Sequence, residues 1–444
     1  MKAVKDGVVS GVHHGGDLRR VHGTHHAAQE ACGTHSSGER GDHCRQAIGP
    51  LCKARRVHAG GSIDHDLLKV ALDATPLLGE PTGVGAFCIG ALEALAQRPE
   101  LEVGAFAVSW RRKDELRPLL PSRVLNTQRA MPARPLHLAW SHLQGPPVEW
   151  FIGPVDVVHG TNYVVPPTRH AGRVVTVHDL TPLRYPQLCD ASSLEFPRLV
   201  RRAVESGAWV HTHSQFVAEE VVTELRIDPS RVRAVHPGIP DHGRVREPEN
   251  APDAVAHLVD PVPAGTTRYV LAVGTVEPRK DYPALVRAFD ILAEKVDDVA
   301  LVIAGANGWG ADALDVALAA SRQRARIVRL GYVAPARLGR LLARAAVVAY
   351  PSVYEGFGFV PLEAMAAGTP VVATAVGAIP EVVGDGALLV APGDVDALAD
   401  ALVTVLCDEA AHSALTERGR QRVGSFTWEA CAAGLADLYA AAAR

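Results

Sequence analysis

Short, almost uninterrupted apolar runs alternate with helical stretches along most of this 444-residue chain. The first set predicts strands at 70–73, 103–108, 155–159, 174–178, 209–214 and 232–236. The second set predicts strands at 269–274, 300–304, 327–330, 347–350, 371–374 and 387–390. Strands that are apolar on both faces and separated by helices are typical of parallel sheets covered on both sides. Two such sets predict an α/β protein with two Rossmann-like domains.

The segment 237–267 lies between the two sets and is rich in proline, glycine and acidic residues, which is typical of a surface connection. We therefore expect a first domain at 66–258 and a second at 259–426. The end of the chain, 427–444, has helical apolar spacing, with Thr427 as its expected N-cap.

The first 65 residues hold nine of the 20 histidines and show almost no apolar periodicity. This composition predicts either a disordered extension or a wrongly assigned start codon. In both cases we expect the folded protein to begin at about residue 66. A zinc site is the alternative, although its candidate ligands lack the usual spacing. Those candidates are His25, His26, Cys32, His35, His43 and Cys44.

Charge and hydropathy exclude several classes of protein. With 45 basic and 49 acidic residues the net charge is −4, which argues against a globally basic nucleic-acid-binding protein. No apolar run reaches the roughly 18 residues of a membrane span, and the first residues do not resemble a signal peptide. The seven scattered cysteines indicate free thiols. These observations predict a cytoplasmic protein.

Ligands of open α/β sheets bind at the carboxyl ends of the strands. After the first predicted strand, Gly83 and Gly85 form a glycine turn that leads into a helix. The N–H groups of such a turn suit a phosphate or a carboxylate. A simple tight turn explains the two glycines equally well.

Two cations, Arg279 and Lys280, follow the strand predicted at 269–274 and precede a helix. Cations at a helix start are unfavourable unless an anion is present, so they predict a diphosphate site. The alternative is a solvated basic pair.

The segment 350–374 carries two carboxylates, Glu355 and Glu363, on either side of Gly356-Phe357-Gly358. The glycines allow backbone N–H groups to approach a ligand closely, and carboxylates accept hydrogen bonds from sugar hydroxyls. The alternative is two solvated glutamates near a helix start. By contrast, Asp394 and Asp396 resemble a metal-binding DxD, but their position predicts a helix cap. We expect no metal and no cofactor.

The motif EGFGFVPLEAMAAGTPVVAT, together with EPRK at 277–280 and TVHDLTPLRYP at 176–186, resembles the signature of retaining GT-B glycosyltransferases of family four. The resemblance covers essentially 67–444. It implies two Rossmann-like domains that face a cleft, with the final helix crossing back to the first domain. The second domain would bind a nucleotide-sugar donor and the first domain the acceptor.

The resemblance also implies roles for individual residues. Glu355 would contact donor-sugar hydroxyls, and Glu363 the ribose. Arg279 and Lys280 would bind the diphosphate, while Gly83, Gly85, Gly356, Phe357 and Gly358 would line the donor site. Tyr332 and Val333 would lie near the base, and His178 near the reacting carbon. The alternative for His178 is a structural histidine. This chain has Thr275 where several relatives carry an arginine.

The resemblance implies transfer of a hexose, with retention, from a donor of the GDP-mannose or UDP-sugar type to a glycan or lipid-linked acceptor. The alternatives are a sugar-nucleotide epimerase of the same fold and a non-catalytic nucleotide-sugar-binding protein. A basic segment at 109–135 suggests peripheral contact with the inner face of a membrane, or else a solvated basic face. Its interleaved apolar residues are Trp110, Leu116, Leu119, Leu120 and Met131.

Overall fold

The structure is a computed structural model that describes residues 67–79, 83–112, 114–127, 129–189, 191, 193–240, 263 and 265–444. Most of the predicted connection at 237–267 lies outside these residues. The extension at 1–65 and its possible histidine and cysteine ligands also lie outside them.

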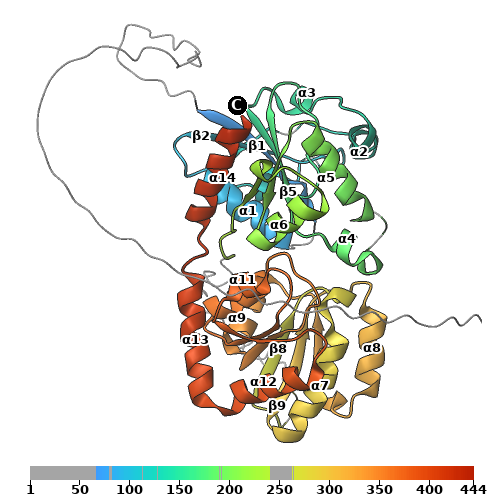
Figure 1. The fold of residues 1–444 in the computed structure, drawn as a ribbon, viewed down its shortest axis with the longest axis vertical. Helices are drawn as coiled ribbons and strands as arrows, with labels where there is room; N and C mark the ends of the chain where they lie inside the picture. Colours follow the sequence, from blue (N-terminus) through green and yellow to red (C-terminus); the bar gives the residue numbers. More distant parts are fainter. Residues whose placement is uncertain are drawn as a thin grey trace, which may run out of the picture. The chain divides into compact units, whose positions relative to one another are not determined.

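The first sheet is wholly parallel and has the strand order β3-β2-β1-β4-β5-β6-β7 (Figure 1). Each of the six strands predicted for this half overlaps an observed strand. The two-residue β3 was not predicted, because it is too short to produce an apolar pattern. The strands are β1 (Leu68–Asp73), β2 (Leu101–Phe106), β3 (Leu125–Asn126), β4 (Val157–Gly160), β5 (Gly172–Val177), β6 (Trp209–Thr212) and β7 (Val232–Ala234).

Helices cover both faces of this sheet, and neighbouring residues of β1 alternate between two hydrophobic cores. Val70 and Leu72 belong to the core that contains α1, whereas Ala71 belongs to the core that contains α2, α5 and α6. This alternation explains why the strands are apolar throughout. The helices are α1 (Gly83–Leu95), α2 (Ala133–His142), α3 (Glu149–Ile152), α4 (Thr181–Arg184), α5 (Phe196–Glu205) and α6 (Gln215–Glu224).

The second sheet is also wholly parallel, with the order β10-β9-β8-β11-β12-β13 (Figure 1). The chain reverses its direction of progress across the sheet between β8 and β11, which is where ligands bind in such folds. All six strands predicted for this half are present. They are β8 (Arg268–Val273), β9 (Val299–Ala304), β10 (Ile327–Gly331), β11 (Val347–Tyr350), β12 (Val371–Thr374) and β13 (Ala387–Val390).

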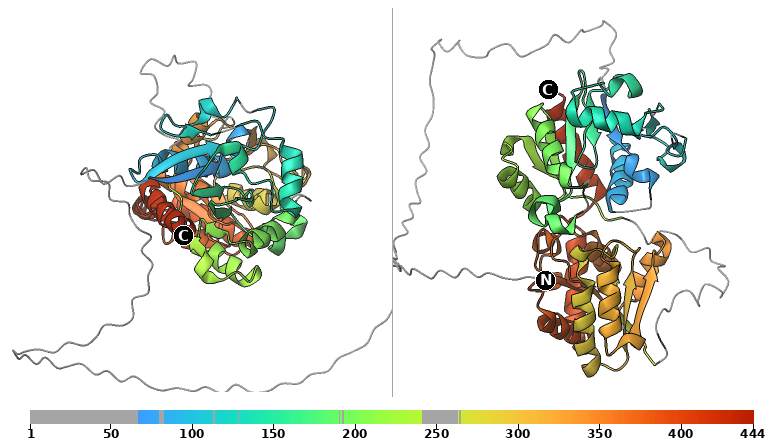
Figure 2. Two further views of the ribbon diagram at one scale, coloured as in Figure 1. Left: turned by 90° about the horizontal axis from the view of Figure 1, so that it is seen from above. Right: turned by 90° about the vertical axis from the view of Figure 1, so that its right-hand side faces the viewer.

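Two layers of helices cover this second sheet (Figure 2). One core contains α7 (Tyr282–Lys295), α8 (Ala311–Ala320) and α12 (Val395–Cys407). The other contains α9 (Pro335–Arg344), α10 (Phe359–Ala366) and α11 (Ile379–Val383). Helix α13 (Glu409–Val423) follows α12. Asp394 accepts a hydrogen bond from Ala397 N at 2.9 Å and caps α12, as its sequence position predicts.

The last helix, α14 (Trp428–Ala442), packs on the first sheet, as the family resemblance implies. The Thr427 side chain caps it by accepting the Ala430 N–H. Leu435 and Tyr439 share a core with Phe87 of α1, and the Tyr439 hydroxyl lies 2.7 Å from His159 Nδ1. A single helix thus contributes both apolar burial and a buried hydrogen bond to the first sheet.

The basic segment at 109–135 is only partly as predicted. Leu116 and Met131 were expected to dip into a membrane interface, but both are fully buried because Leu116 packs in the core that contains α1 and Met131 in the core that contains α2. That part of the prediction is wrong. Trp110 and Leu119 are exposed, at 63% and 45%. No helix in the described ranges is long and apolar enough to cross a membrane.

Candidate functional site

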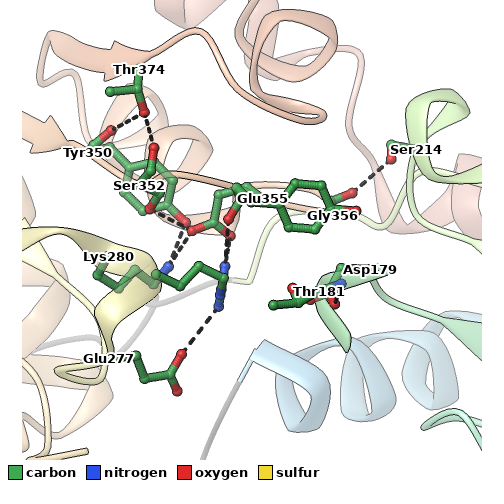
Figure 3. A network of polar contacts seen from close by, with 12 residues as sticks. Asp179, Thr181, Ser214, Glu277, Lys280, Tyr350, Ser352, Glu355, Gly356 and Thr374 are labelled. Atoms are coloured by element: carbon green, nitrogen blue, oxygen red, sulfur yellow. Dashed lines mark hydrogen bonds and ion pairs between the residues drawn. The ribbon is translucent and has the colours of Figure 1, made fainter. Parts of the chain in front are cut away.

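Two cations and one carboxylate meet at the carboxyl edge of the second sheet, where β8 and β11 lie side by side. Glu355 follows β11, and its Oε2 lies 2.7 Å from Arg279 Nη1. Its Oε1 lies 2.7 Å from Lys280 Nζ. Arg279 and Lys280 occupy a single 3-10 turn after β8, which lies between Glu277 and Asp281. Figure 3 shows Lys280 pointing toward the Glu355 carboxylate.

Hydrogen bonds from neighbouring hydroxyls complete this triad. The Ser352 hydroxyl donates to Glu355 Oε1 at 2.7 Å, and Lys280 Nζ donates to the Tyr350 hydroxyl at 2.9 Å. Lys280 also lies 4.6 Å from the centroid of the Tyr350 ring. Nothing in the sequence pattern singled out Tyr350 or Ser352, because both look like ordinary strand-end residues.

The triad is charged despite its burial. Burial by itself would raise the pKa of Glu355, but Arg279 and Lys280 outweigh it and lower the pKa to about 2. Burial lowers the pKa of Lys280, against the opposing effect of Glu355. Glu355 is therefore ionised at any physiological pH, and its charge is neutralised by two cations.

The loop after Glu355 touches the first sheet through its backbone. A Cβ on Gly356 would overlap the carbonyl oxygen of His178, so only glycine fits there. The Ser214 hydroxyl donates to the Gly356 carbonyl at 2.8 Å. Gly358 has φ of +115°, the left-handed region that favours glycine, and is the residue before α10. The two glycines thus have different functions. Gly356 allows the close approach of the two backbones, and Gly358 takes the left-handed conformation that precedes α10.

His178 lies just after β5, and both of its ring nitrogens have protein partners. Nε2 donates to the Thr161 carbonyl at 2.8 Å, so Nδ1 accepts from His213 Nε2 at 2.9 Å. Burial lowers the pKa of His178 to about 4, which keeps the ring neutral. The His178 carbonyl rather than its ring lies against Gly356.

The other predicted residues are spread more widely. Phe357 is buried and packs its ring against Phe359. Glu363 is buried on α10. Tyr332 and Val333 follow β10, which β9 and β8 separate from β11.

Gly83 and Gly85 begin α1 in the first sheet. A Cβ on Gly83 would lie 3.5 Å from the Phe359 ring at the start of α10. The start of α1 is thus adjacent to the loop that follows Glu355. Gly85 is buried within the first turn.

Glu381 on α11 is a further polar residue that the sequence pattern did not reveal. Its carboxylate accepts the backbone N–H groups of Gln215 and Phe216, each at 2.8 Å, and lies 2.8 Å from His236 Nε2. It therefore binds the N-terminus of α6, a favourable place for a negative charge. Its partners lie more than a hundred positions away along the chain, so no local signal identifies it.

A large cavity of about 1000 Å³ lies in the first half of the chain, lined mainly by residues of α2, α5 and the loop after β4. Asp73, at the carboxyl end of β1, borders it. Burial raises the pKa of Asp73, although Thr75 opposes this by donating from its hydroxyl to the carboxylate at 2.5 Å. The sequence analysis did not identify Asp73, because a single aspartate at a strand end is a common turn residue.

Two parallel sheets of this order, with a cation pair at the switch point of the second, have the architecture of the GT-B fold. The profile "Glycosyl transferases group 1" matches residues 259–422, and "Glycosyltransferase Family 4" matches residues 81–242. The chain belongs to glycosyltransferase family 4, as its motifs indicate, and it is a glycosyltransferase.

Two relatives and one solved structure illustrate the similarity. The chain is 30% identical to O-antigen chain mannosyltransferase B of Escherichia coli, over 64% of this chain and 74% of the relative. It is also 30% identical to a D-inositol 3-phosphate glycosyltransferase of Nocardioides sp., over 71% and 69% respectively. The structure of HepE from Anabaena in complex with UDP-glucose superposes with a TM-score of 0.62 at 18% identity, covering 84% of this chain and all of HepE.

Proposed function

We propose that this chain transfers a hexosyl group from a nucleoside diphosphate sugar to a hydroxyl group of a glycan or lipid-linked acceptor, with retention of anomeric configuration. The observation that carries the proposal is the buried triad of Arg279, Lys280 and Glu355 at the strand ends of the second sheet. Two adjacent cations match the charge of a diphosphate, and a carboxylate matches sugar hydroxyls.

The triad suggests how the donor binds. Both cations are occupied by Glu355, so an incoming diphosphate competes with that carboxylate for the same N–H groups. Once displaced, the Glu355 oxygens are available to accept hydrogen bonds from the sugar. Because the cations are already fixed, they stabilise the negative charge that develops on the leaving diphosphate without further reorganisation.

Retention follows from the family, whose proposed mechanism lets the leaving diphosphate assist removal of the acceptor proton on the same face of the sugar. The proton then ends on the diphosphate, and the new glycosidic bond replaces the bond to it. In that mechanism the protein supplies position and charge stabilisation rather than a nucleophile.

The relatives support a hexose donor of the GDP-mannose or UDP-glucose kind. The similar protein of Escherichia coli is named as a mannosyltransferase, and HepE was solved with UDP-glucose. The assay below also separates transfer from the activity of an epimerase and from non-catalytic binding. They differ in product: an epimerase releases no nucleoside diphosphate as part of its net reaction, and a binder releases none at all.

The test uses the full chain with UDP-glucose and GDP-mannose, with and without a membrane or glycan extract as the acceptor source. We expect acceptor-dependent release of UDP or GDP, and nuclear magnetic resonance of the product should show the anomeric configuration of the donor. An inverted product would contradict retention. Donor binding with neither nucleotide release nor epimerisation of the donor sugar would favour the non-catalytic binder.

Lys280→Met provides the binding test, because it removes one of the two cations. We expect at least tenfold weaker binding of UDP or GDP by calorimetry. Lys295→Met is the matched control, since Lys295 forms an exposed pair with Asp400 on α12. Equal nucleotide affinity for Lys280→Met and the wild type would overturn the assigned donor site.

A further inference from the structure

We propose that Tyr354, Glu220 and Arg184 are positioning residues that hold the donor loop against the first domain. The donor loop is the segment 351–358 between β11 and α10. The rate of transfer should depend on these three residues, whereas nucleotide binding should not. This inference rests on the proposed transfer reaction, because it assigns the residues an effect on that reaction.

One hydroxyl group joins three segments of the chain. The Tyr354 hydroxyl donates to the Glu220 carboxylate on α6 and accepts the Leu180 N–H at 3.1 Å. A phenol can donate one hydrogen bond and accept others, so the two contacts are compatible. Tyr354 is only 4% exposed, which shields both bonds from water. The donor loop, α6 and the residue two positions after His178 thus meet at one oxygen atom.

The backbone of Tyr354 belongs to the donor site. Its carbonyl accepts Arg279 Nη1 at 3.0 Å, and the preceding Val353 N–H donates to the Arg279 carbonyl at 2.9 Å. The next residue is Glu355, whose carboxylate pairs with Arg279 and Lys280. A displacement of Tyr354 would therefore move Glu355 and change its orientation relative to the first domain.

Arg184 closes these contacts into a ring. Its Nε donates to Glu220 Oε1 at 3.0 Å, and its Nη2 lies 2.9 Å from Glu224 Oε1, one turn further along α6. Arg184 ends α4, and Leu180 immediately precedes that helix. The ring therefore runs from Leu180 through α4 to Arg184. It returns to Leu180 through Glu220 and Tyr354.

Stability alone explains this ring poorly. Glu220 is buried, and burial raises its pKa, whereas the Tyr354 hydroxyl and Arg184 act in the opposite direction. Replacing a buried ion pair with apolar side chains of similar volume is often neutral or stabilising. A polar ring next to Glu355 has a clearer explanation as a device that fixes one orientation of the donor loop.

Helix α6 has another attachment to the second domain, which does not involve the triad. Glu381 of α11 accepts the Gln215 and Phe216 N–H groups at the start of α6, each at 2.8 Å. This contact is retained when the Tyr354 hydroxyl is removed. Removal of the hydroxyl therefore tests the orientation of the donor loop rather than the association of the two domains.

Tyr354→Phe removes the hydroxyl and keeps the ring, which lies 5.6 Å from the Tyr185 ring between centroids. We expect kcat for acceptor-dependent nucleotide release to fall at least tenfold. The donor KM and the affinity for UDP or GDP should stay within threefold of the wild type, because the ion pairs of the triad lie within the second domain. A nucleotide affinity that fell as much as kcat would assign the ring to donor binding and overturn the proposal.

Tyr269→Phe is the matched control. It also removes a buried hydroxyl of the second domain, which donates to the Leu341 carbonyl at 2.8 Å near the start of β8. We expect both variants to lose stability to a similar extent in denaturant titration, but only Tyr354→Phe to lose kcat. Rates are measured at a temperature at which every variant is folded. An equal kcat in the two variants would mean that the ring is merely structural.

A double variant separates positioning from packing. Glu220→Met combined with Tyr354→Phe replaces both partners of the hydrogen bond with apolar groups, so we expect it to regain stability relative to either single variant. Its kcat should remain as low as that of Tyr354→Phe. Glu219→Gln, at an exposed neighbour on α6, is the control and should keep the kcat of the wild type. A kcat of the double variant within twofold of the wild type would overturn the proposal.

Hydrogen–deuterium exchange reports on the donor loop without any activity. In the absence of nucleotide, we expect peptides that cover 351–358 to exchange at least fivefold faster in Tyr354→Phe than in the wild type or in Tyr269→Phe. Unchanged exchange would show that the ring does not fix the loop and would overturn the proposal at any level of activity. A wild type that released no nucleotide would instead contradict the proposed function, and the exchange result would still decide whether the ring holds the loop.

Discussion

Lys280 and Glu355 form a 2.7 Å ion pair whose two side chains are only 11% and 8% exposed. The pair joins the turn after β8 to the loop after β11, and Arg279 completes it from the same turn. Removing one partner of a buried pair leaves the other charge uncompensated, which typically costs about 3–5 kcal/mol. Substitutions in this site therefore need a stability measurement beside the activity measurement.

Glu355→Gln should separate binding from transfer. Glutamine keeps the shape of the side chain but releases the two cations, so we expect UDP or GDP to bind as tightly as to the wild type or more tightly. Transfer should fall about 100-fold, because the carboxylate no longer accepts hydrogen bonds from the donor sugar.

Calorimetry and acceptor-dependent nucleotide release measure the two effects of Glu355→Gln. Glu294→Gln is its control, since Glu294 forms an exposed pair with Arg322. Nucleotide binding at least tenfold weaker in Glu355→Gln would contradict competition between Glu355 and the diphosphate.

Gly356→Ala should disrupt the contact between the two halves of the site. The Cβ of the alanine would overlap the His178 carbonyl. Moving this backbone group away costs more free energy than rotating a flexible side chain. We expect a loss of about 1–3 kcal/mol in the free energy of unfolding, together with a loss of transfer activity. Denaturant titration and the release assay measure these two quantities.

Gly424→Ala is the matched control for this substitution, because Gly424 has φ of −58° and its added Cβ would have its nearest neighbour at 3.4 Å. We expect it to change unfolding and activity little. If Gly356→Ala were as stable and active as Gly424→Ala, the close approach would not be required.

Tyr439→Phe tests how α14 is attached to the first sheet. The substitution removes the hydroxyl that lies 2.7 Å from His159 Nδ1 and leaves that buried nitrogen unpaired. We expect the free energy of unfolding to fall by about 1–3 kcal/mol. Tyr332→Phe is the control, because Tyr332 is half-exposed, and it should leave the free energy of unfolding unchanged. A stability of Tyr439→Phe equal to that of the wild type would mean that apolar packing alone holds the helix.

Buried histidines of the first sheet predict a loss of stability in acid. Burial lowers the pKa of His178 to about 4 and that of His211 to about 3, from 6.5. The unfolded chain therefore binds more protons than the folded one between about pH 6.5 and 4. Each of the two histidines lowers the free energy of unfolding by about 1.4 kcal/mol for each pH unit that the pH falls in this window.

His211→Asn should reduce this pH dependence by about one proton, as measured by denaturant unfolding from pH 7 to pH 4. His170→Asn, at an exposed histidine, is the control and should leave the slope close to that of the wild type. An unchanged slope in His211→Asn would show that its ring already takes up a proton in the folded state.

The sequence alone was enough to locate every strand of the two sheets except the two-residue β3. Every predicted strand overlaps an observed one, and Thr427 caps the last helix as expected. Asp394 caps α12, as its sequence position likewise predicts. These features are local. Apolar runs, turn residues and caps depend on neighbours within a few positions, so they can be predicted without a structure.

Tertiary structure decided which residues meet. The pairing of Lys280 with Glu355 joins residues 75 positions apart, and the sequence placed both at strand ends without indicating that they contact each other. Leu116 appeared to be a surface residue of a basic segment but lies in the core. The His178 ring forms hydrogen bonds with Thr161 and His213, partners that its position at a strand end did not indicate. Such contacts depend on burial and on distances between remote segments, which arise only when the sheets and their loops assemble.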